Sequence, residues 1–126
     1  IQFTNGIAFG PDNFLYVNET FTGNIYRYKW EDGEIISGRE DFCKIDKGPD
    51  GMKFSESGNL YCTVYNSSEI DIINPMGKVI ERLQTKDFSP TNIVFGPSNA
   101  HKVFVTTAPN GIEIFDVDED GFPLYK

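Results

Sequence analysis

The stretch that decides the fold is NGIAFGPDNFLYVNETFTGNIYRYKWEDGEI, residues 5–35, because two later stretches repeat its pattern. The second copy is DGMKFSESGNLYCTVYNSSEIDIINPMGKVI, residues 50–80, which aligns without a gap at an offset of 45 residues. The third copy is TNIVFGPSNAHKVFVTTAPNGIEIFDVDEDGFPL, residues 91–124, which begins 41 residues later and carries a short insertion near Ala100. Self-similarity at such a period indicates a repeat architecture.

Each repeat predicts four short strands separated by tight turns. In the first repeat the strands are expected around residues 7–9, 15–17, 25–28 and 42–45, where Ile, Val, Phe and Tyr are frequent. The breaks between them, such as GPDN, SESGN and EDGE, are rich in the residue types that tight turns need. No segment shows the helical apolar period of about 3.6 residues, so the sequence predicts an all-β chain.

Four antiparallel strands that recur at this spacing are typical of β-propeller blades. We therefore predict a single partial β-propeller domain of about three blades, at approximately residues 4–46, 47–88 and 89–126. An all-β sandwich is the alternative, but it leaves the regular offset unexplained. Three blades form an open arc with unprotected edges, so the missing blades are expected from the rest of a longer chain or from a second copy. The abrupt beginning within a strand pattern favours a fragment.

Charge and cysteine content limit the partners and the compartment. The chain has 19 acidic against 11 basic residues, a formal net charge of -8, which disfavours nucleic acid or an anionic membrane as a partner. The same acidity suits a bound cation, but it is also typical of a soluble surface with Asp and Glu in its turns. Cys43 and Cys62 fit neither a disulfide framework nor a zinc motif, so we expect buried free thiols and a cytoplasmic location. No window is apolar enough for a membrane span.

One repeat position predicts a polar ring at the end of the central channel. The innermost strand of each blade lines that channel, and the ring position holds Asn5, Asp50 and Thr91. A carboxylate and an amide oxygen that converge there would suit calcium or another divalent cation. Asn and Asp before Gly are also ordinary turn formers, so position alone leaves both interpretations open.

The segments around this ring resemble those of the SMP-30, gluconolactonase and luciferin-regenerating-enzyme family, which includes regucalcin. GPDGMKFSESGNLY, residues 48–61, is similar to the family's Pro-Asp-Gly-Met segment and the strand after it. TNGIAF, residues 4–9, is similar to its Asn-Gly strand start. SPTNIVFG and VFVTTA, residues 89–96 and 103–108, are similar to its Pro-Thr-Asn and Tyr-Val-Thr segments. The resemblance covers nearly the whole chain and corresponds to the later blades.

The resemblance implies half of a six-bladed propeller with one divalent cation in its channel, held by a Glu, an Asn and an Asp. Matched motif to motif, Asn5 takes the place of the metal-binding Asn. Asp50 takes the place of the metal-binding Asp that is also the proposed general base. This sequence offers no counterpart of the Glu. Calcium is the first choice of ion, with zinc, magnesium and manganese as alternatives.

The same resemblance implies a gluconolactonase-type hydrolase, in which a metal-activated water attacks the carbonyl of a small-molecule lactone. Loops that follow the second strands emerge at the ring end of the channel and can line the pocket. The candidate substrate-binding residues are Glu19, Thr20, Tyr65, Asn66 and Thr91. Glu19 and Thr20 replace an Asp and a small residue that are common in the family, so the pocket shape is expected to differ. The alternative is a non-catalytic propeller that acts as a binding or scaffold module.

The stretch DVDEDG, residues 116–121, resembles the opening of a calcium-binding EF-hand loop. We reject that interpretation, because no glutamate follows at the twelfth loop position before the sequence ends. Its repeat equivalents, WEDG and NPMG, predict instead a hairpin between the third and fourth strands of the last blade.

Overall fold

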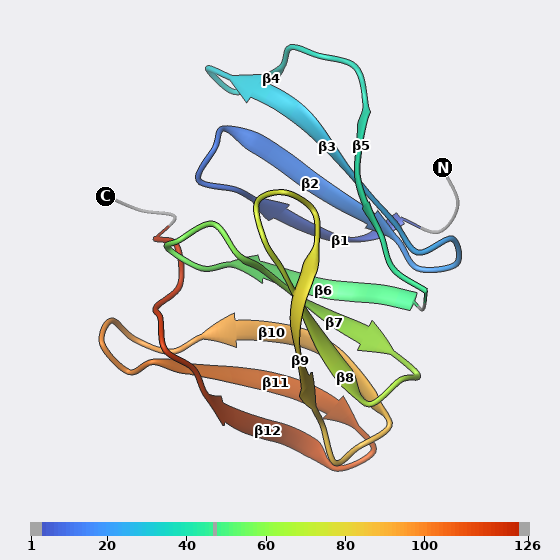
Figure 1. Cartoon of the computed structure of the whole chain (residues 1–126), viewed down its shortest axis with the longest axis vertical. Helices are drawn as coiled ribbons and strands as arrows, with labels where there is room; N and C mark the ends of the chain where they lie inside the picture. The colour runs from blue at the N-terminus through green and yellow to red at the C-terminus, as the bar shows by residue number, and fades with distance from the viewer. Residues whose placement is uncertain (1–3, 47, 124–126) are drawn as a thin grey trace.

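The computed structural model describes residues 4–46 and 48–123, and this part of the chain forms strands and turns without a helix (Figure 1). The first sheet contains β1 (Thr4–Phe9), β2 (Phe14–Glu19), β3 (Asn24–Glu31), β4 (Glu34–Ile35) and β5 (Glu40–Lys44). The second sheet contains β6 (Gly48–Phe54), β7 (Leu60–Tyr65), β8 (Glu69–Ile73) and β9 (Val79–Gln84). The third sheet contains β10 (Ser89–Phe95), β11 (Lys102–Ala108) and β12 (Gly111–Asp116). The predicted all-β architecture is confirmed.

The strand order within the sheets follows the chain, as expected of blades. In the second sheet the order is β6-β7-β8-β9, a simple meander of antiparallel neighbours. In the first sheet β5 pairs with β3 and takes the place of the predicted fourth strand. The short strand β4 was not expected, and it pairs with the end of β3 across a turn in which Gly33 has a φ of 81°. Only glycine adopts that backbone conformation without strain.

The first strands of the three sheets lie side by side, with β6 between β1 and β10 (Figure 1). The sheets pack face to face on either side of the middle sheet, since β2 also contacts β6 and β7 contacts β10. This arrangement brings the beginnings of β1, β6 and β10 to one end of the molecule. The loops that follow β2, β7 and β11 emerge at the same end, because each second strand runs antiparallel to the first.

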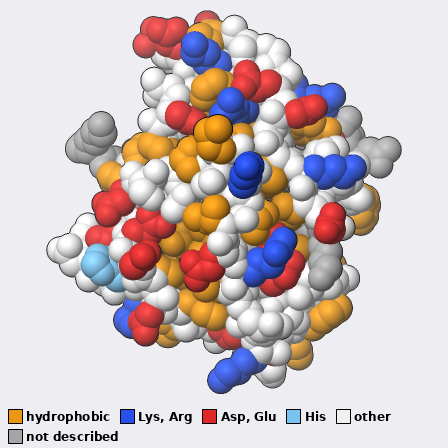
Figure 2. Space-filling model, in the orientation of Figure 1, with side chains coloured by type: hydrophobic (Ala, Val, Ile, Leu, Met, Phe, Trp, Pro, Cys, Tyr) orange, Lys and Arg blue, Asp and Glu red, His pale blue; other side chains and the backbone are white. Residues whose placement is uncertain are grey.

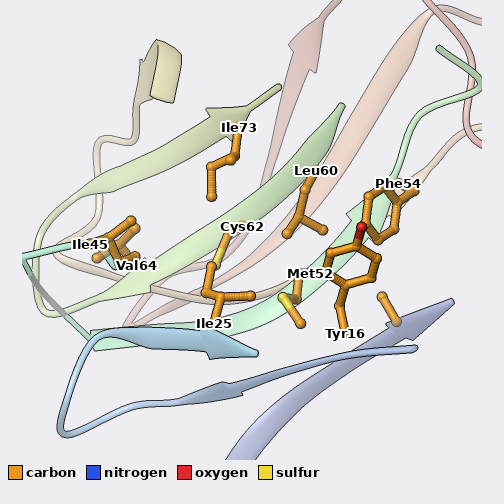
Figure 3. Packing of buried hydrophobic residues seen from close by; sticks show 10 residues of the cluster. Tyr16, Ile25, Ile45, Met52, Phe54, Leu60, Cys62, Val64 and Ile73 are labelled. Atoms are coloured by element: carbon orange, nitrogen blue, oxygen red, sulfur yellow. The ribbon is translucent and has the colours of Figure 1, made fainter. Parts of the chain in front are cut away.

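Two apolar clusters hold the three sheets together. The first lies between the first and second sheets and includes Tyr16, Ile25, Met52 and Leu60 (Figure 3). The second cluster lies between the second and third sheets and includes Ile70, Ile93, Val103 and Val105. Burying side chains of this size is the main favourable contribution to folding, at about 1.5–3 kcal/mol each.

The middle sheet is buried on both faces, and β7 shows this along its length. Leu60, Cys62 and Val64 contact the first cluster, whereas Tyr61 on the opposite face contacts the second. Successive strand residues point to opposite faces, so a strand covered on both sides has an uninterrupted apolar run. In contrast, the outer face of the third sheet leaves Ile112 69% exposed.

The last described segment does not form the predicted hairpin. Residues 117–123 follow β12 and cross back to the turn between β6 and β7, where Ser55 and Gly121 form a β-bridge. The Phe122 amide donates to the Phe54 carbonyl at 2.9 Å, and the Phe122 side chain packs against the first apolar cluster. Tyr61 donates its hydroxyl to Glu119 Oε2 at 2.8 Å. These contacts to the middle sheet draw the segment away from β12.

Charged side chains of both signs are interspersed over the face shown in Figure 2, with apolar side chains between them. Cys62 is buried and Cys43 is half-buried, and both are free thiols. The expectation of two buried thiols is therefore correct for Cys62 alone. The described residues include no helix that is long and apolar enough to cross a membrane.

Candidate functional site

Each inner strand contains an irregularity at the predicted ring position. The register of β1 against β2 shifts between Thr4 and Ile7, and that of β6 against β7 shifts between Pro49 and Met52. A shift between Pro90 and Asn92 occurs where β10 pairs with β11. Residues in a β-bulge leave the regular ladder, which re-aims their side chains. Asn5, Asp50 and Thr91 therefore lie in bulges, not in regular strand.

The bulges of neighbouring sheets pack directly on one another. A Cβ atom added to Gly6 would lie 2.0 Å from the carbonyl oxygen of Asp50, which is far inside contact distance. A Cβ atom added to Gly51 would lie 2.6 Å from the Cα of Asn92. Glycine is required at both positions because the backbone of the next sheet occupies the side-chain space. The structure thus brings the backbones of the three ring positions into one cluster.

Asn18 joins the first two bulges through its side-chain amide. Its Oδ1 accepts a hydrogen bond from the Gly6 amide at 2.9 Å, and its Nδ2 donates to the Asp50 carbonyl at 2.6 Å. Asn18 is fully buried, so these bonds are shielded from water. Sequence reasoning missed this residue. A usable signal was a polar side chain recurring in the second strand of each repeat, at Asn18, Thr63 and Thr106.

Thr20 forms a second connection between the same two sheets. Its hydroxyl donates to the Pro49 carbonyl at 2.8 Å and accepts a hydrogen bond from Asn5 Nδ2 at 3.2 Å. The side chain of Asn5 is thereby tied to the residue that precedes Asp50. Thr20 itself is half-buried at the end of β2.

Asp50 is half-buried in the bulge of the middle sheet. Burial raises the pKa of the Asp50 carboxyl above its ordinary value, because partial desolvation disfavours the charged form. The Asp50 carboxylate and the Asn5 amide oxygen are donors that a hard divalent cation accepts. Among the described residues there is no group of three or more His, Cys, Asp or Glu side chains that could hold a metal.

Thr91 completes the ring position in the third sheet. Its hydroxyl lies 2.9 Å from the hydroxyl of Thr106, and the two share a hydrogen bond. Thr91 is half-buried. A hydroxyl in this position can accept or donate a hydrogen bond but brings no charge.

Glu19 is located differently from the predicted loop position. β2 continues through Glu19, which is only 2% exposed. Its Oε1 accepts hydrogen bonds from the Thr22 hydroxyl at 2.7 Å and the Tyr26 hydroxyl at 3.2 Å. The strand alternation turns Glu19 to the face opposite Asn18, so the carboxylate supports the β2–β3 turn inside the first sheet.

Tyr65 and Asn66 lie on the loop side of the second sheet, as expected. Tyr65 is the last residue of β7 and is 43% exposed. Asn66 is exposed in the following turn with a φ of 61°, and its Oδ1 accepts a hydrogen bond from the Ser89 hydroxyl at 2.8 Å. Asn is among the few residue types that adopt this left-handed conformation readily. These two side chains are therefore accessible to a ligand at the ring end.

A cavity of about 440 Å³ opens at the opposite end of the inner strands. Its lining is mainly apolar and includes Phe9, Phe54, Val94 and the segment 120–123. None of the predicted site residues lines it. The polar cluster at Asn5 and Asp50 and this apolar cavity are therefore separate features of the structure.

The chain is similar to known proteins in sequence and in fold. Residues 1–109 match the family model described as the SMP-30/gluconolactonase/LRE-like region. An uncharacterized protein of Sulfolobus acidocaldarius is 33% identical, over 99% of this chain and 50% of that protein. A 6-deoxy-6-sulfogluconolactonase of Pseudomonas putida is 26% identical, over 86% of this chain and 39% of that protein.

A solved structure shows the same arrangement of strands. The calcium-binding protein regucalcin from Agrobacterium tumefaciens is 20% identical, covers 98% of this chain and 49% of its own, and superposes with a TM-score of 0.81. At that identity the likeness shows the fold, and it supports the β-propeller architecture that the repeat predicts. The chain spans about half, or less, of the length of these relatives.

Proposed function

The chain belongs to the SMP-30/gluconolactonase/LRE-like family, and on that premise we propose that the complete protein is a metal-dependent lactone hydrolase of the gluconolactonase type. The observation that carries the proposal is the packing of the Asn5–Gly6 bulge on the Asp50 backbone. It brings the backbones of Asn5–Gly6 and Asp50, which belong to neighbouring blades, together at one end of the arc. A small-molecule lactone is the proposed substrate, which the similarity to a sulfogluconolactonase supports.

In this proposal Asn5 and Asp50 hold one divalent cation. Calcium is the first choice for two reasons. The ligands are an amide oxygen and carboxylate oxygens, which calcium prefers. In addition, a structural relative is described as calcium-binding. Zinc, magnesium and manganese are the alternatives. A bound cation would polarise the lactone carbonyl and lower the pKa of a water molecule. The further ligands, including the expected Glu, would come from blades outside this chain.

Asp50 is the proposed general base as well as a ligand. It takes a proton from the attacking water while the water oxygen bonds to the carbonyl carbon. The ring C–O bond then breaks, and the proton passes to the departing alkoxide, which gives the open hydroxy acid.

The proposed substrate contacts are the accessible polar groups around this cluster. They are Tyr65, Asn66 and Thr91, which lie at the ring end of the second and third blades. Glu19 is left out because its carboxylate is enclosed in the first sheet. Thr20 borders the cluster, but its hydroxyl already bonds to Pro49 and Asn5.

Completion of the propeller is part of the same proposal. The missing blades would come from the rest of a longer chain or from a second copy, covering the exposed apolar side chains at the ends of the arc, such as Ile7 and Ile112. The free thiols of Cys43 and Cys62 fit a reducing compartment, and we propose the cytoplasm.

The test uses the protein produced from its complete reading frame. Calcium should raise the midpoint of thermal unfolding, and at 100 times the dissociation constant the added stability is about 2.7 kcal/mol. Hydrolysis of a gluconolactone is measured as the release of acid. This activity should require the cation and should stop when EDTA removes it. Asp50→Asn should lower kcat by about 100-fold or more.

Asp46→Asn is the matched control, because Asp46 is an exposed carboxyl in the loop that precedes β6. This variant should keep the activity and the calcium response of the wild-type protein. A wild-type protein that neither gains stability from any of the four cations nor hydrolyses lactones would contradict the proposal. It would favour a propeller that serves as a binding or scaffold module.

A further inference from the structure

Thr20 bonds to the side chain of one proposed ligand, Asn5, and to the carbonyl of the residue that precedes the other, Asp50. We infer that Thr20 is a positioning residue: its hydroxyl fixes the Asn5 amide so that Oδ1 is presented to a cation. The inference rests on the proposed function, because it assigns a role within that metal site. The sequence predicts that Thr20 contacts substrate; in the structure its hydroxyl bonds to the Pro49 carbonyl and to the Asn5 side chain.

The hydroxyl of Thr20 has one proton, and the structure shows where it goes. The Pro49 carbonyl lies 2.8 Å from Thr20 Oγ1 and can only accept, so the proton is committed to it. Thr20 Oγ1 can then only accept from Asn5, which it does from Nδ2 at 3.2 Å. The amide is thereby oriented with its NH2 group toward Thr20.

This orientation matters because an amide has two faces of opposite character. Oδ1 is an acceptor and a suitable ligand for a hard cation, whereas Nδ2 carries two donor hydrogens that a cation repels. The two atoms share one carbon, so holding Nδ2 against Thr20 also holds Oδ1 on the other side. Without Thr20 the amide of exposed Asn5 can rotate by half a turn and present the wrong atom.

Thr20 and Asn18 act together on the same pair of ligands. Asn18 bonds the Gly6 amide to the Asp50 carbonyl, and thereby fixes the two bulges relative to each other. Thr20 bonds the Asn5 side chain to the Pro49 carbonyl, one residue before Asp50. The backbone separation of the two ligands is therefore set by Asn18 in β2, and the orientation of the Asn5 side chain by Thr20, which directly follows β2.

The second repeat lacks this arrangement, which argues against a general packing role. Its equivalents of Asn18 and Thr20, at the offset of 45 residues, are Thr63 and Tyr65. Thr63 donates to the Gly51 carbonyl within its own sheet and does not reach the next one. In the described residues the double connection links the Asn5–Gly6 bulge to the Pro49–Asp50 backbone.

The test measures calcium affinity by titration calorimetry on the protein from its complete reading frame. Thr20→Val keeps the branched shape but removes the hydroxyl, and Thr20→Ser keeps the hydroxyl. Loss of a residue that orients a metal ligand typically weakens metal binding by about 10- to 100-fold, so we expect at least a tenfold rise in the dissociation constant for Thr20→Val. The dissociation constant of Thr20→Ser should remain within about threefold of the wild-type value, because the serine hydroxyl can form both hydrogen bonds.

Thr22→Val is the matched control, because Thr22 bonds to Glu19 in the same turn and does not contact Asn5. It should lose stability in urea as Thr20→Val does, yet keep wild-type calcium affinity. Equal affinities of wild type and Thr20→Val, or a serine variant as weak as the valine variant, would overturn the inference and leave the proposed function standing. If Thr20→Val does not fold, Thr20→Ala replaces it with the same criterion. A wild-type protein that binds no divalent cation would overturn both.

Discussion

Replacing Gly6 with alanine should separate the first two sheets where the Asn5–Gly6 bulge packs on the Asp50 backbone. The new Cβ would lie 2.0 Å from the Asp50 carbonyl oxygen and 2.5 Å from Asn18 Nδ2. Ordinary contacts of a Cβ begin at 3.4 Å, so the two backbones must move apart by about 1.4 Å. The Asp50 carbonyl and the buried Asn18 amide are hydrogen-bonded to each other, so neither can move aside like the free end of a flexible side chain.

The size of the effect follows from the hydrogen bonds that such a movement breaks. The bond from Gly6 to Asn18, at 2.9 Å, and the bond from Asn18 to Asp50, at 2.6 Å, are both lost or stretched. Each net hydrogen bond contributes about 1 kcal/mol, and a buried polar group left unpaired adds about 1–3 kcal/mol. We therefore expect the free energy of unfolding to fall by about 3–5 kcal/mol, a large part of the 5–15 kcal/mol typical of a domain.

Urea unfolding followed by circular dichroism and by the fluorescence of Trp30 measures this loss. Gly38→Ala is the control, because an added Cβ there meets nothing within 4 Å. That variant should change stability by less than about 1 kcal/mol. If the unfolding free energies of Gly6→Ala and Gly38→Ala differ by less than about 0.5 kcal/mol, the two bulges do not pack as closely as described. The geometric basis of the proposed metal site would then be lost as well.

Three further outcomes follow from the contacts described. Leu60 is fully buried between the sheets, so Leu60→Ala should lower the unfolding free energy in urea titrations by about 2–5 kcal/mol. Ile80 is 54% exposed, so Ile80→Ala should change the unfolding free energy little. Equal effects of the two substitutions would contradict the core described above. Burial alone would raise the pKa of Glu119, but hydrogen bonds from Ser57, Tyr61 and other neighbours outweigh it and lower the pKa below its ordinary value of 4.5. Because the pKa of Glu119 is lower in the folded state, this residue stabilises the protein above about pH 4.5 and loses that effect as the pH falls through the lowered pKa. The difference in unfolding free energy between wild type and Glu119→Gln should therefore become smaller from pH 7 to pH 3. A difference that stays constant over this range would contradict the lowered pKa. Tyr61→Phe removes the hydroxyl that bonds Glu119 at 2.8 Å, so amide hydrogen exchange of Phe122 should speed up in this variant, and unchanged exchange would show that the crossing segment is held by other contacts.

The sequence predicts the strands well because their signals are local. The apolar runs and the turns rich in Gly, Asn and Asp depend only on neighbours in the chain, and the second sheet follows them closely. The offset of 45 residues also identifies Asn5 and Asp50 as equivalent positions, and their bulges do pack together in the structure. Their roles as ligands remain a prediction from the family resemblance.

Other features depend on contacts between sheets, which no local pattern encodes. Glu19 was expected in a loop, but the strand continues through it and its partners Thr22 and Tyr26 enclose it. Residues 116–121 were expected to form a hairpin, yet hydrogen bonds to the middle sheet draw the segment 117–123 across to it. In both cases the stabilising groups lie on another strand or another sheet.

The sequence by itself determined the repeat, the all-β character and the ring position, because a repeated unit places equivalent residues at equivalent positions. Only the tertiary structure decided how neighbouring units fix one another. Asn18 and Thr20 act across a sheet boundary, on Asp50 and Pro49 that are about 30 residues further along the chain. A hydrogen bond of that kind exists only after the sheets have packed, so it is decided by folding and cannot be read from one repeat.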